Sequence, residues 1–257
     1  MKKFKEYYDD NLKLNEVMYV FFDESGTYKN SEINKSIKEY RKKGIVSGGR
    51  DNFNISAVAI SRAKYMSLRN EINTTKEHSC FDHTKYKHRT DYSFRNFTDR
   101  EEVAYIECMD YFTNISKLMK KYKLPTYSIG YNFKTFEEAD YSDIYIKSLR
   151  KLISEMKYNI ANDHIFKKHK KIYFIFEKMA DRKIQEQIEQ LASNDSQEKF
   201  SYLWTEKGNV GNELSDLIAY NNSRYYANDL FLHTSFSFYN YPNHITKSIK
   251  INKNIVQ

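Results

Sequence analysis

Two short apolar segments, each followed directly by a carboxylate, most constrain the fold that this chain can adopt. Residues 17–22 read VMYVFF and lead into Asp23 and Glu24. Residues 171–176 read KIYFIF and lead into Glu177. Runs this short, rich in β-branched and aromatic residues, are typical of strands buried on both faces. Because an unpaired buried carboxylate is strongly disfavoured, acids at the ends of such strands indicate a site that needs a cation or several hydrogen-bond donors.

The rest of the sequence predicts an α/β fold in which strands and amphipathic helices follow one another. Further strands are expected at 54–60, 127–133, 200–204 and 231–239, and helices at 62–74, 100–123, 138–158, 181–192 and 211–220. The polar segment 27–51 predicts an inserted hairpin tip or a mobile loop. The sequence shows no internal repeat and no heptad pattern, so neither a repeat array nor a coiled coil is expected.

Composition favours one folded domain. Hydrophobic residues make up 40% of the 257 residues, and no Pro-, Gly- or Ser-rich linker divides them. We therefore expect a single domain over 1–257, with a core at 17–226 and an aromatic, basic C-terminal extension at 227–257. No apolar run is long enough to span a membrane and the N-terminus lacks a signal sequence, which predicts a cytoplasmic protein. The isolated Cys80 and Cys108 fit a reducing compartment.

The charge of the chain indicates an anionic partner. The net charge is +8, and part of it is concentrated near the start of the second carboxylate-ending strand. Nucleic acid is the expected partner of such a surface. The candidate contact residues are Lys167, Lys168, Lys170 and Lys171. Taken alone, a lysine run of this kind is more often a solvated helix end or loop, and only the basic runs of the chain together favour a phosphate-binding surface.

A third group of acids lies on the last predicted helix. Glu213 and Asp216 are three residues apart, which places both on one helix face. Carboxylate oxygens are the ligands that Mg²⁺ prefers, and a cluster of them with room for a phosphate is what metal-dependent phosphodiester hydrolysis requires. The sequence therefore predicts a site for Mg²⁺ or Mn²⁺. Its candidate ligands are Asp23, Glu177, Asp216 and Glu213.

Two of these segments resemble a known family. Residues 19–27 (YVFFDESGT) and 212–220 (NELSDLIAY) are similar to the early and late signatures of the family called domain of unknown function 3800. The resemblance extends over about 17–226. It implies an α/β fold of the ribonuclease H-like type, with a mixed five-stranded sheet flanked by helices and with helical and loop insertions.

The resemblance also implies roles for particular residues. It gives catalytic roles to Asp23, Glu24, Glu177, Asp216 and His83. In this scheme His83 contacts the scissile phosphate or shuttles a proton. The chain departs from the family at Glu213 and Ser215, where Gln and Ala are expected, and at Glu177, where the family often has Asp and where the ligand is one methylene longer.

The sequence thus leads to two functional hypotheses. The first is a metal-dependent nuclease that acts on RNA slightly in preference to DNA; by analogy it would suit a conditional effector in bacterial phage defence. The second is an inactive nucleic-acid-binding or regulatory module on the same fold. Dependence on Mg²⁺ or Mn²⁺ separates them, because only the nuclease should be stabilised by metal. A homodimer and a protein activator both remain open.

Overall fold

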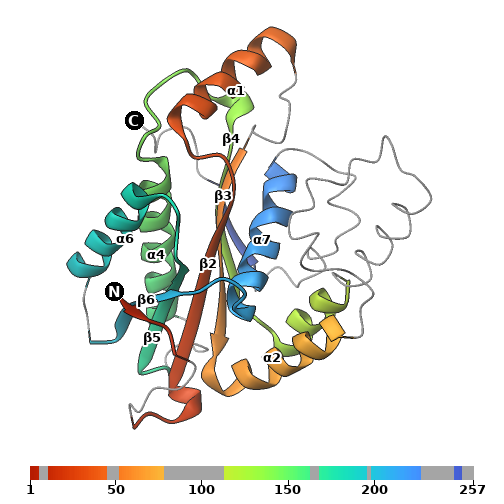
Figure 1. Cartoon of the computed structure of the whole chain (residues 1–257), viewed down its shortest axis with the longest axis vertical. Coiled ribbons are helices and arrows are strands. Elements are labelled where there is room, and N and C mark those ends of the chain that lie inside the picture. Colours follow the sequence, from red (N-terminus) through yellow and green to blue (C-terminus); the bar gives the residue numbers. More distant parts are fainter. Residues whose placement is uncertain are drawn as a thin grey trace.

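The strands of the computed structural model form one sheet (Figure 1). The structure describes residues 1–5, 11–44, 52–77, 113–162, 168–195, 198–226 and 246–250. In these ranges the strands are β1 (Lys2–Lys3), β2 (Val17–Gly26), β3 (Asn52–Ser61), β4 (Thr126–Asn132), β5 (Lys171–Glu177), β6 (Phe200–Thr205) and β7 (Thr246–Lys250). They lie in the order β1-β6-β5-β2-β3-β4-β7.

The sheet is mixed, as predicted. Strands β2, β3 and β4 form an antiparallel meander, whereas β5 lies parallel to β2 and β6 lies parallel to β5. The short strands β1 and β7 add to the two edges, each parallel to its neighbour. The α/β class is confirmed, but the expected number of five strands is wrong. Both additional strands are polar and pair through their backbones at an edge, so no apolar run marks them.

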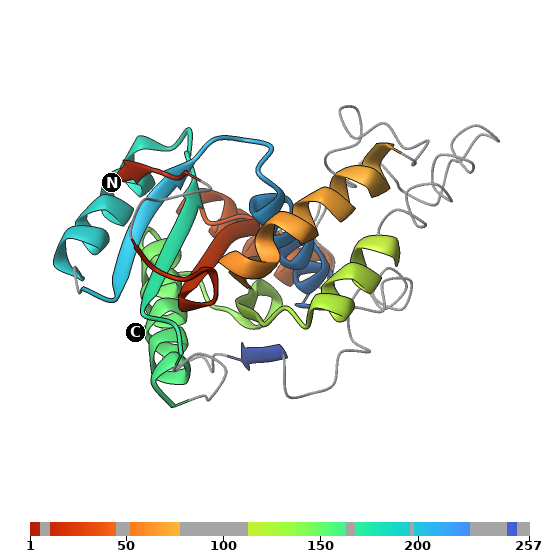
Figure 2. The same ribbon diagram turned by 90° about the horizontal axis from the view of Figure 1, so that it is seen from below.

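Helices cover both faces of the sheet (Figure 2). They are α1 (Asn30–Lys43), α2 (Arg62–Glu77), α4 (Ile144–Asn162), α6 (Arg182–Asn194) and α7 (Val210–Tyr226), with short 3₁₀ turns η1 (Leu14–Glu16) and η4 (Phe133–Thr135). Of the expected helix 100–123, the part at 113–122 is described and is helical. The expected strand 231–239 lies outside the described residues. None of the described helices is both long and apolar enough to cross a membrane.

Alternate residues of the central strand face two separate cores. On β2, Met18, Val20 and Phe22 pack with side chains of α1, α4 and α6. The intervening Tyr19 and Phe21 pack with side chains of α2 and α7. This alternation follows from the two-residue repeat of a strand. It also decides which face each carboxylate at the strand's end points to.

The polar segment 27–51 contains a helix and not the loop that its composition suggested. In α1 the buried Ile33 and Ile37 are four residues apart and pack against the sheet, while the rest of the helix surface is polar. Basic residues fill its last turn, and Gly44 follows in the left-handed conformation (φ 71°), with its N–H donating to Tyr40 O at 2.7 Å. This is a common helix ending. One pair of isoleucines among many polar residues is too weak a periodicity to predict it.

Candidate functional site

The two apolar strands bring their terminal acids to the same edge of the sheet. Strands β2 and β5 are parallel neighbours, and Phe22 pairs with Phe176. The next residue on each strand is therefore Asp23 on β2 and Glu177 on β5. Neighbouring strands are about 4.8 Å apart, so these two backbone positions lie side by side.

Strand alternation places the acids on different faces. Asp23 shares the face of Phe21, and Glu177 shares the face of Ile175, which is the face covered by α7. Glu24 points to the opposite face, where Tyr145 Oη of α4 donates a hydrogen bond to Glu24 Oε2 at 3.3 Å. The acids of the Asp-Glu-Ser-Gly motif thus meet two different helical layers.

The glycine of that motif is required by the backbone. Gly26 has φ +89°, and a Cβ atom there would lie 2.2 Å from Asn52 O. Thr27 then donates its N–H to the same Asn52 oxygen at 3.0 Å. Any larger residue would be strained and would collide with β3. The glycine therefore fixes the end of β2 directly beyond the carboxylates.

Helix α7, which carries Asp216, lies over β2, β3 and β4 (Figure 1). It approaches closely because Gly211 has no side chain: a Cβ there would lie 2.3 Å from the ring of Phe21. Asn212 Nδ2 donates to Phe22 O at 3.3 Å, next to Asp23. Asp216 follows Asn212 by four residues and therefore lies on the same helix face.

A buried polar row anchors the other end of α7. Asn222 Nδ2 donates to Ser56 Oγ at 3.3 Å and to Ser128 Oγ at 2.9 Å. Ser56 is paired with Asp23 across β2 and β3, and Ser128 is paired with Ser56 across β3 and β4. The row therefore continues sideways from the acids, and hydrogen bonds hold α7 on either side of Asp216.

Burial and neighbouring negative charge raise the pKa of two of the carboxylates, Asp23 and Glu24. Burial is the main cause that raises the pKa of Asp23 well above its usual range, and the charges of Glu24, Asp216 and Glu177 add to it. Burial likewise raises the pKa of Glu24 to about 7, against the opposing hydrogen bond from Tyr145. Asp216 and Glu177 contribute to that rise as well. The four acids therefore lie within electrostatic reach of one another.

This donor set suits a hard divalent cation. All four acids offer oxygen ligands, and the charges of Asp216 and Glu177 add to the effect of burial in raising the pKa of Asp23 and Glu24. Asn212 Oδ1 is buried and accepts no hydrogen bond from the described residues, so another oxygen lacks a partner beside the acids. Across the described ranges no three His, Cys, Asp or Glu side chains are grouped closely enough to hold an ion as they stand. Binding would therefore require side-chain rearrangement.

A pocket of about 470 Å³ opens over this edge. Asp23, Glu24 and Glu177 line it together with Lys178 and Lys207. Its remaining walls are aromatic or come from the segment after β5, and are formed by Phe22, Tyr28, Tyr145, Phe176, Met179, Ala180 and Asp181. The pocket thus combines carboxylates, cations and apolar surface in a volume of ligand-binding size.

Three of the predicted acids, Asp23, Glu24 and Glu177, meet at the pocket, and Asp216 lies within their electrostatic reach. Glu213 has a different environment: its carboxylate forms an ion pair with Lys76 at the end of α2 and is not part of the pocket lining. A helix spacing of three residues predicted a shared face, but the neighbouring α2 supplies a partner for one of the two. His83 lies outside the described residues.

The predicted basic cluster lies at the opposite end of β5. Lys171 begins that strand and Glu177 ends it, so six steps of about 3.3 Å, roughly 20 Å, separate them. Lys170 forms an ion pair with Glu16 at 2.6 Å, and Lys171 Nζ donates to Glu198 O at 2.6 Å. Lys168 is exposed, and Lys167 lies outside the described residues. The described lysines of this cluster are therefore not beside the carboxylates.

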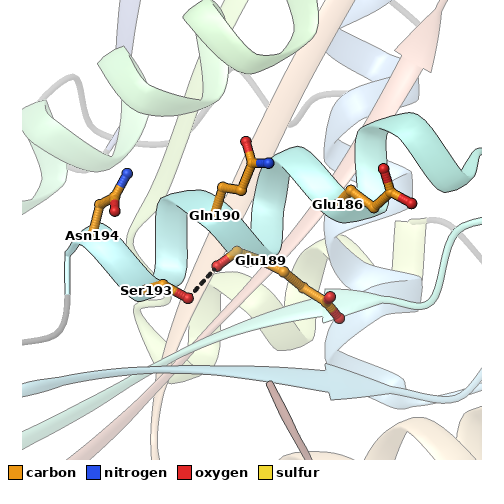
Figure 3. A pocket seen from close by; sticks show the side chains of 5 residues that line it. All are labelled: Glu186, Glu189, Gln190, Ser193 and Asn194. Carbon is orange, nitrogen blue, oxygen red and sulfur yellow. Dashed lines mark hydrogen bonds between the residues drawn. The ribbon is translucent and has the colours of Figure 1, made fainter.

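Another hollow, of about 430 Å³, lies along α6 (Figure 3). It is lined by one helix alone, through Glu186, Glu189, Gln190, Ser193 and Asn194. Glu189 accepts a hydrogen bond from Trp204 Nε1 at 2.9 Å, and Ser193 Oγ donates to Glu189 O. These contacts are internal to the fold, and the described residues that line the hollow all come from this one helix.

Comparison of the chain with protein-family models, curated proteins and solved structures found no match. Function is therefore inferred from the site.

Sequence reasoning missed Lys178, Lys207, Asn212 and Tyr145. Lys178 and Lys207 follow predicted strand ends, so strand-end position was a usable signal for them, and Asn212 directly precedes the predicted acid Glu213. Tyr145 comes from a helix far along the chain, and nothing local marks it.

Proposed function

We propose that this protein is a metal-dependent nuclease of the ribonuclease H-like type that hydrolyses phosphodiester bonds. The arrangement of the central strands supports the fold assignment. Strands β2, β3 and β4 form a meander, β5 and β6 follow in parallel on its other side, and an acid-bearing helix comes last. Asp23 lies on β2 and Glu177 on β5, the first and fourth strands of this series, which is where the ribonuclease H-like fold that the resemblance implies carries its acids.

The observation that carries the proposal is the convergence of Asp23, Glu24 and Glu177 at the wall of one pocket, where burial and repulsion between negative charges raise the pKa of Asp23 and Glu24. Such repulsion destabilises the fold unless a ligand offsets it, and its retention at a pocket is typical of functional sites. Asp23, Glu177 and Asp216 would hold Mg²⁺ or Mn²⁺. When bound, such an ion activates water and offsets negative charge on a phosphate.

The chain's own residues would orient the reacting groups. Tyr145 holds the carboxylate of Glu24 by its hydrogen bond, and Glu24 lines the pocket, where a carboxylate can accept a proton from water. Gly26 and Gly211 fix the two backbones that carry Asp23 and Asp216. RNA as the preferred substrate, a catalytic role for His83 and action in phage defence remain proposals that rest on the resemblance alone.

The second candidate is an inactive nucleic-acid-binding module. The observation that favours it is that the acids in the described residues are not grouped as a preformed ion site. Such a module would bind nucleic acid equally well with chelator and with metal.

Cleavage assays separate the two candidates. Labelled single-stranded RNA and DNA are incubated with wild-type protein and with Asp216→Asn, each with Mn²⁺, with Mg²⁺ and with excess chelator. The nuclease predicts cleavage by wild type that requires metal and is lost in Asp216→Asn. Binding without cleavage in every condition would favour the module, and cleavage that survives both chelator and Asp216→Asn would contradict the site.

A further inference from the structure

Two lysines lie at the carboxyl edge of the sheet beside the acids. Lys178 directly follows Glu177, and its N–H donates to Thr205 O at the end of β6 at 3.1 Å. Lys207 comes two residues after that strand end. Both line the same pocket as the carboxylates.

Neither lysine has a strong structural role. The Lys207 side chain is 79% exposed and approaches Glu177 only to 3.9 Å. An exposed pair of this kind contributes at most about 1 kcal/mol. Lys178 is exposed as well and forms no ion pair with any described residue. Their charge is thus available to a ligand in the pocket.

The order of the charges follows the order of the strands. Asp23 and Glu24 lie near the end of β2, Glu177 ends β5 with Lys178 directly after it, and Lys207 follows β6 by two residues. Because neighbouring strands are about 4.8 Å apart, the edge changes from acidic to basic over roughly 10 Å. A polyanion with one phosphate at the acids would place a following phosphate toward β6, where the cations are.

We propose that Lys178 and Lys207 bind the backbone of a single nucleic-acid strand that runs along this edge from β2 toward β6. This inference rests on the proposed nuclease function and extends it to the path of the substrate. The rival path uses the lysines at the start of β5, which are roughly 20 Å from Glu177. The size of the pocket, about 470 Å³, matches a short stretch of one strand and not a duplex.

The test measures binding of fluorescent 12-nucleotide RNA and DNA by anisotropy, in Mn²⁺ and at several KCl concentrations. All proteins carry Asp216→Asn so that the strand stays intact. The variant is Lys178→Gln with Lys207→Gln. The matched control is Lys117→Gln with Lys120→Gln, which removes two exposed lysines from the helical segment 113–122. A third protein carries Lys168→Gln with Lys170→Gln and tests the rival path.

Loss of two phosphate contacts should reduce the slope of log affinity against log salt by about 1.4 and weaken binding about 10-fold at low salt. The control should keep the slope of the parent. In proteins with Asp216 restored, the Lys178 and Lys207 changes should leave the affinity for Mn²⁺ at least as strong as in wild type, because they remove only cations.

Three results would overturn the proposal. The first is an unchanged salt slope in the Lys178 and Lys207 variant. The second is a reduced slope in the Lys168 and Lys170 variant instead. The third is weaker Mn²⁺ binding by the Lys178 and Lys207 variant, which would mean that the lysines hold the acids in position. If wild type binds no oligonucleotide under any condition, the proposed function fails together with the path. Retained binding with an unchanged slope refutes the path alone.

Discussion

Replacement of Glu24 by Gln should stabilise the metal-free protein at alkaline pH. Glu24 lies among three other carboxylates, and its pKa is raised from an ordinary value of 4.5 to about 7, first by burial. Gln keeps the shape and can still accept the hydrogen bond from Tyr145, but it carries no charge. The substitution therefore removes the repulsion and little else.

The sign and size follow from proton linkage. A folded-state pKa above the unfolded value means that the protonated carboxyl stabilises the fold. That stability is fully present below about pH 4.5 and is lost as the pH rises through about 7. The difference of about 2.5 pKa units corresponds to roughly 3 kcal/mol. Because the carboxylate borders a solvent-accessible pocket, we expect about 1 to 2 kcal/mol at pH 8.

Thermal unfolding in chelator measures this directly. Glu24→Gln should unfold about 3 to 6 °C above wild type at pH 8, and close to wild type at pH 4.5. With Mn²⁺ the difference at pH 8 should shrink, since the bound ion offsets the negative charge that the substitution removes. Glu186→Gln, on the outer side of α6, is the matched control and should change neither comparison. Equal melting temperatures for Glu24→Gln and wild type at pH 8, or an equal gain at both pH values, would refute the reasoning.

Three other substitutions test how the site is held. Gly26→Ala places a methyl group against Asn52 O at a residue with positive φ, so it should lower the free energy of unfolding by at least about 1 to 2 kcal/mol. Urea titration measures this, and an unchanged midpoint would contradict the turn geometry. Gly211→Ala places a methyl group against the ring of Phe21, so it should lower the free energy of unfolding by about 1 to 3 kcal/mol and weaken Mn²⁺ binding. A Mn²⁺ affinity equal to that of wild type would show that α7 need not approach β2 so closely. Asn222→Ala removes the hydrogen bonds to Ser56 and Ser128 and should lower the free energy of unfolding by about 1 to 3 kcal/mol. The effects of Asn222→Ala and Ser128→Ala should not add in the double variant; strict additivity would mean that the two residues do not act as a pair.

The carboxylate edge was predictable because local sequence specifies it. Each acid directly follows an apolar run, and a strand buried on both faces is recognised from such a run alone. The pairing of β2 with β5 brings Asp23 and Glu177 together, as expected for parallel neighbours. Helix α7 was also predicted, though its start at Val210 and its end at Tyr226 extend beyond the expected 211–220.

The features that sequence reasoning missed depend on contacts between distant segments. The ion pair of Glu213 with Lys76 joins residues that lie far apart in the chain, and so does the hydrogen bond from Tyr145 to Glu24. The lysine run at 167–171 drew attention by its density, whereas Lys178 and Lys207 are single cations whose importance comes only from strand order. Helix α1 was missed because two isoleucines among polar residues give little periodicity.

Binding of Mn²⁺ is the most direct test of the central claim, that Asp23, Glu177 and Asp216 form a divalent metal site. Titration calorimetry would compare wild type with Asp23→Asn, Glu177→Gln, Asp216→Asn and the control Glu186→Gln at pH 8. The account predicts that wild type and the control bind alike and that each of the other three loses at least about 10-fold in affinity, or about 1.4 kcal/mol. Equal affinity in all five proteins, or no binding by wild type, would contradict it.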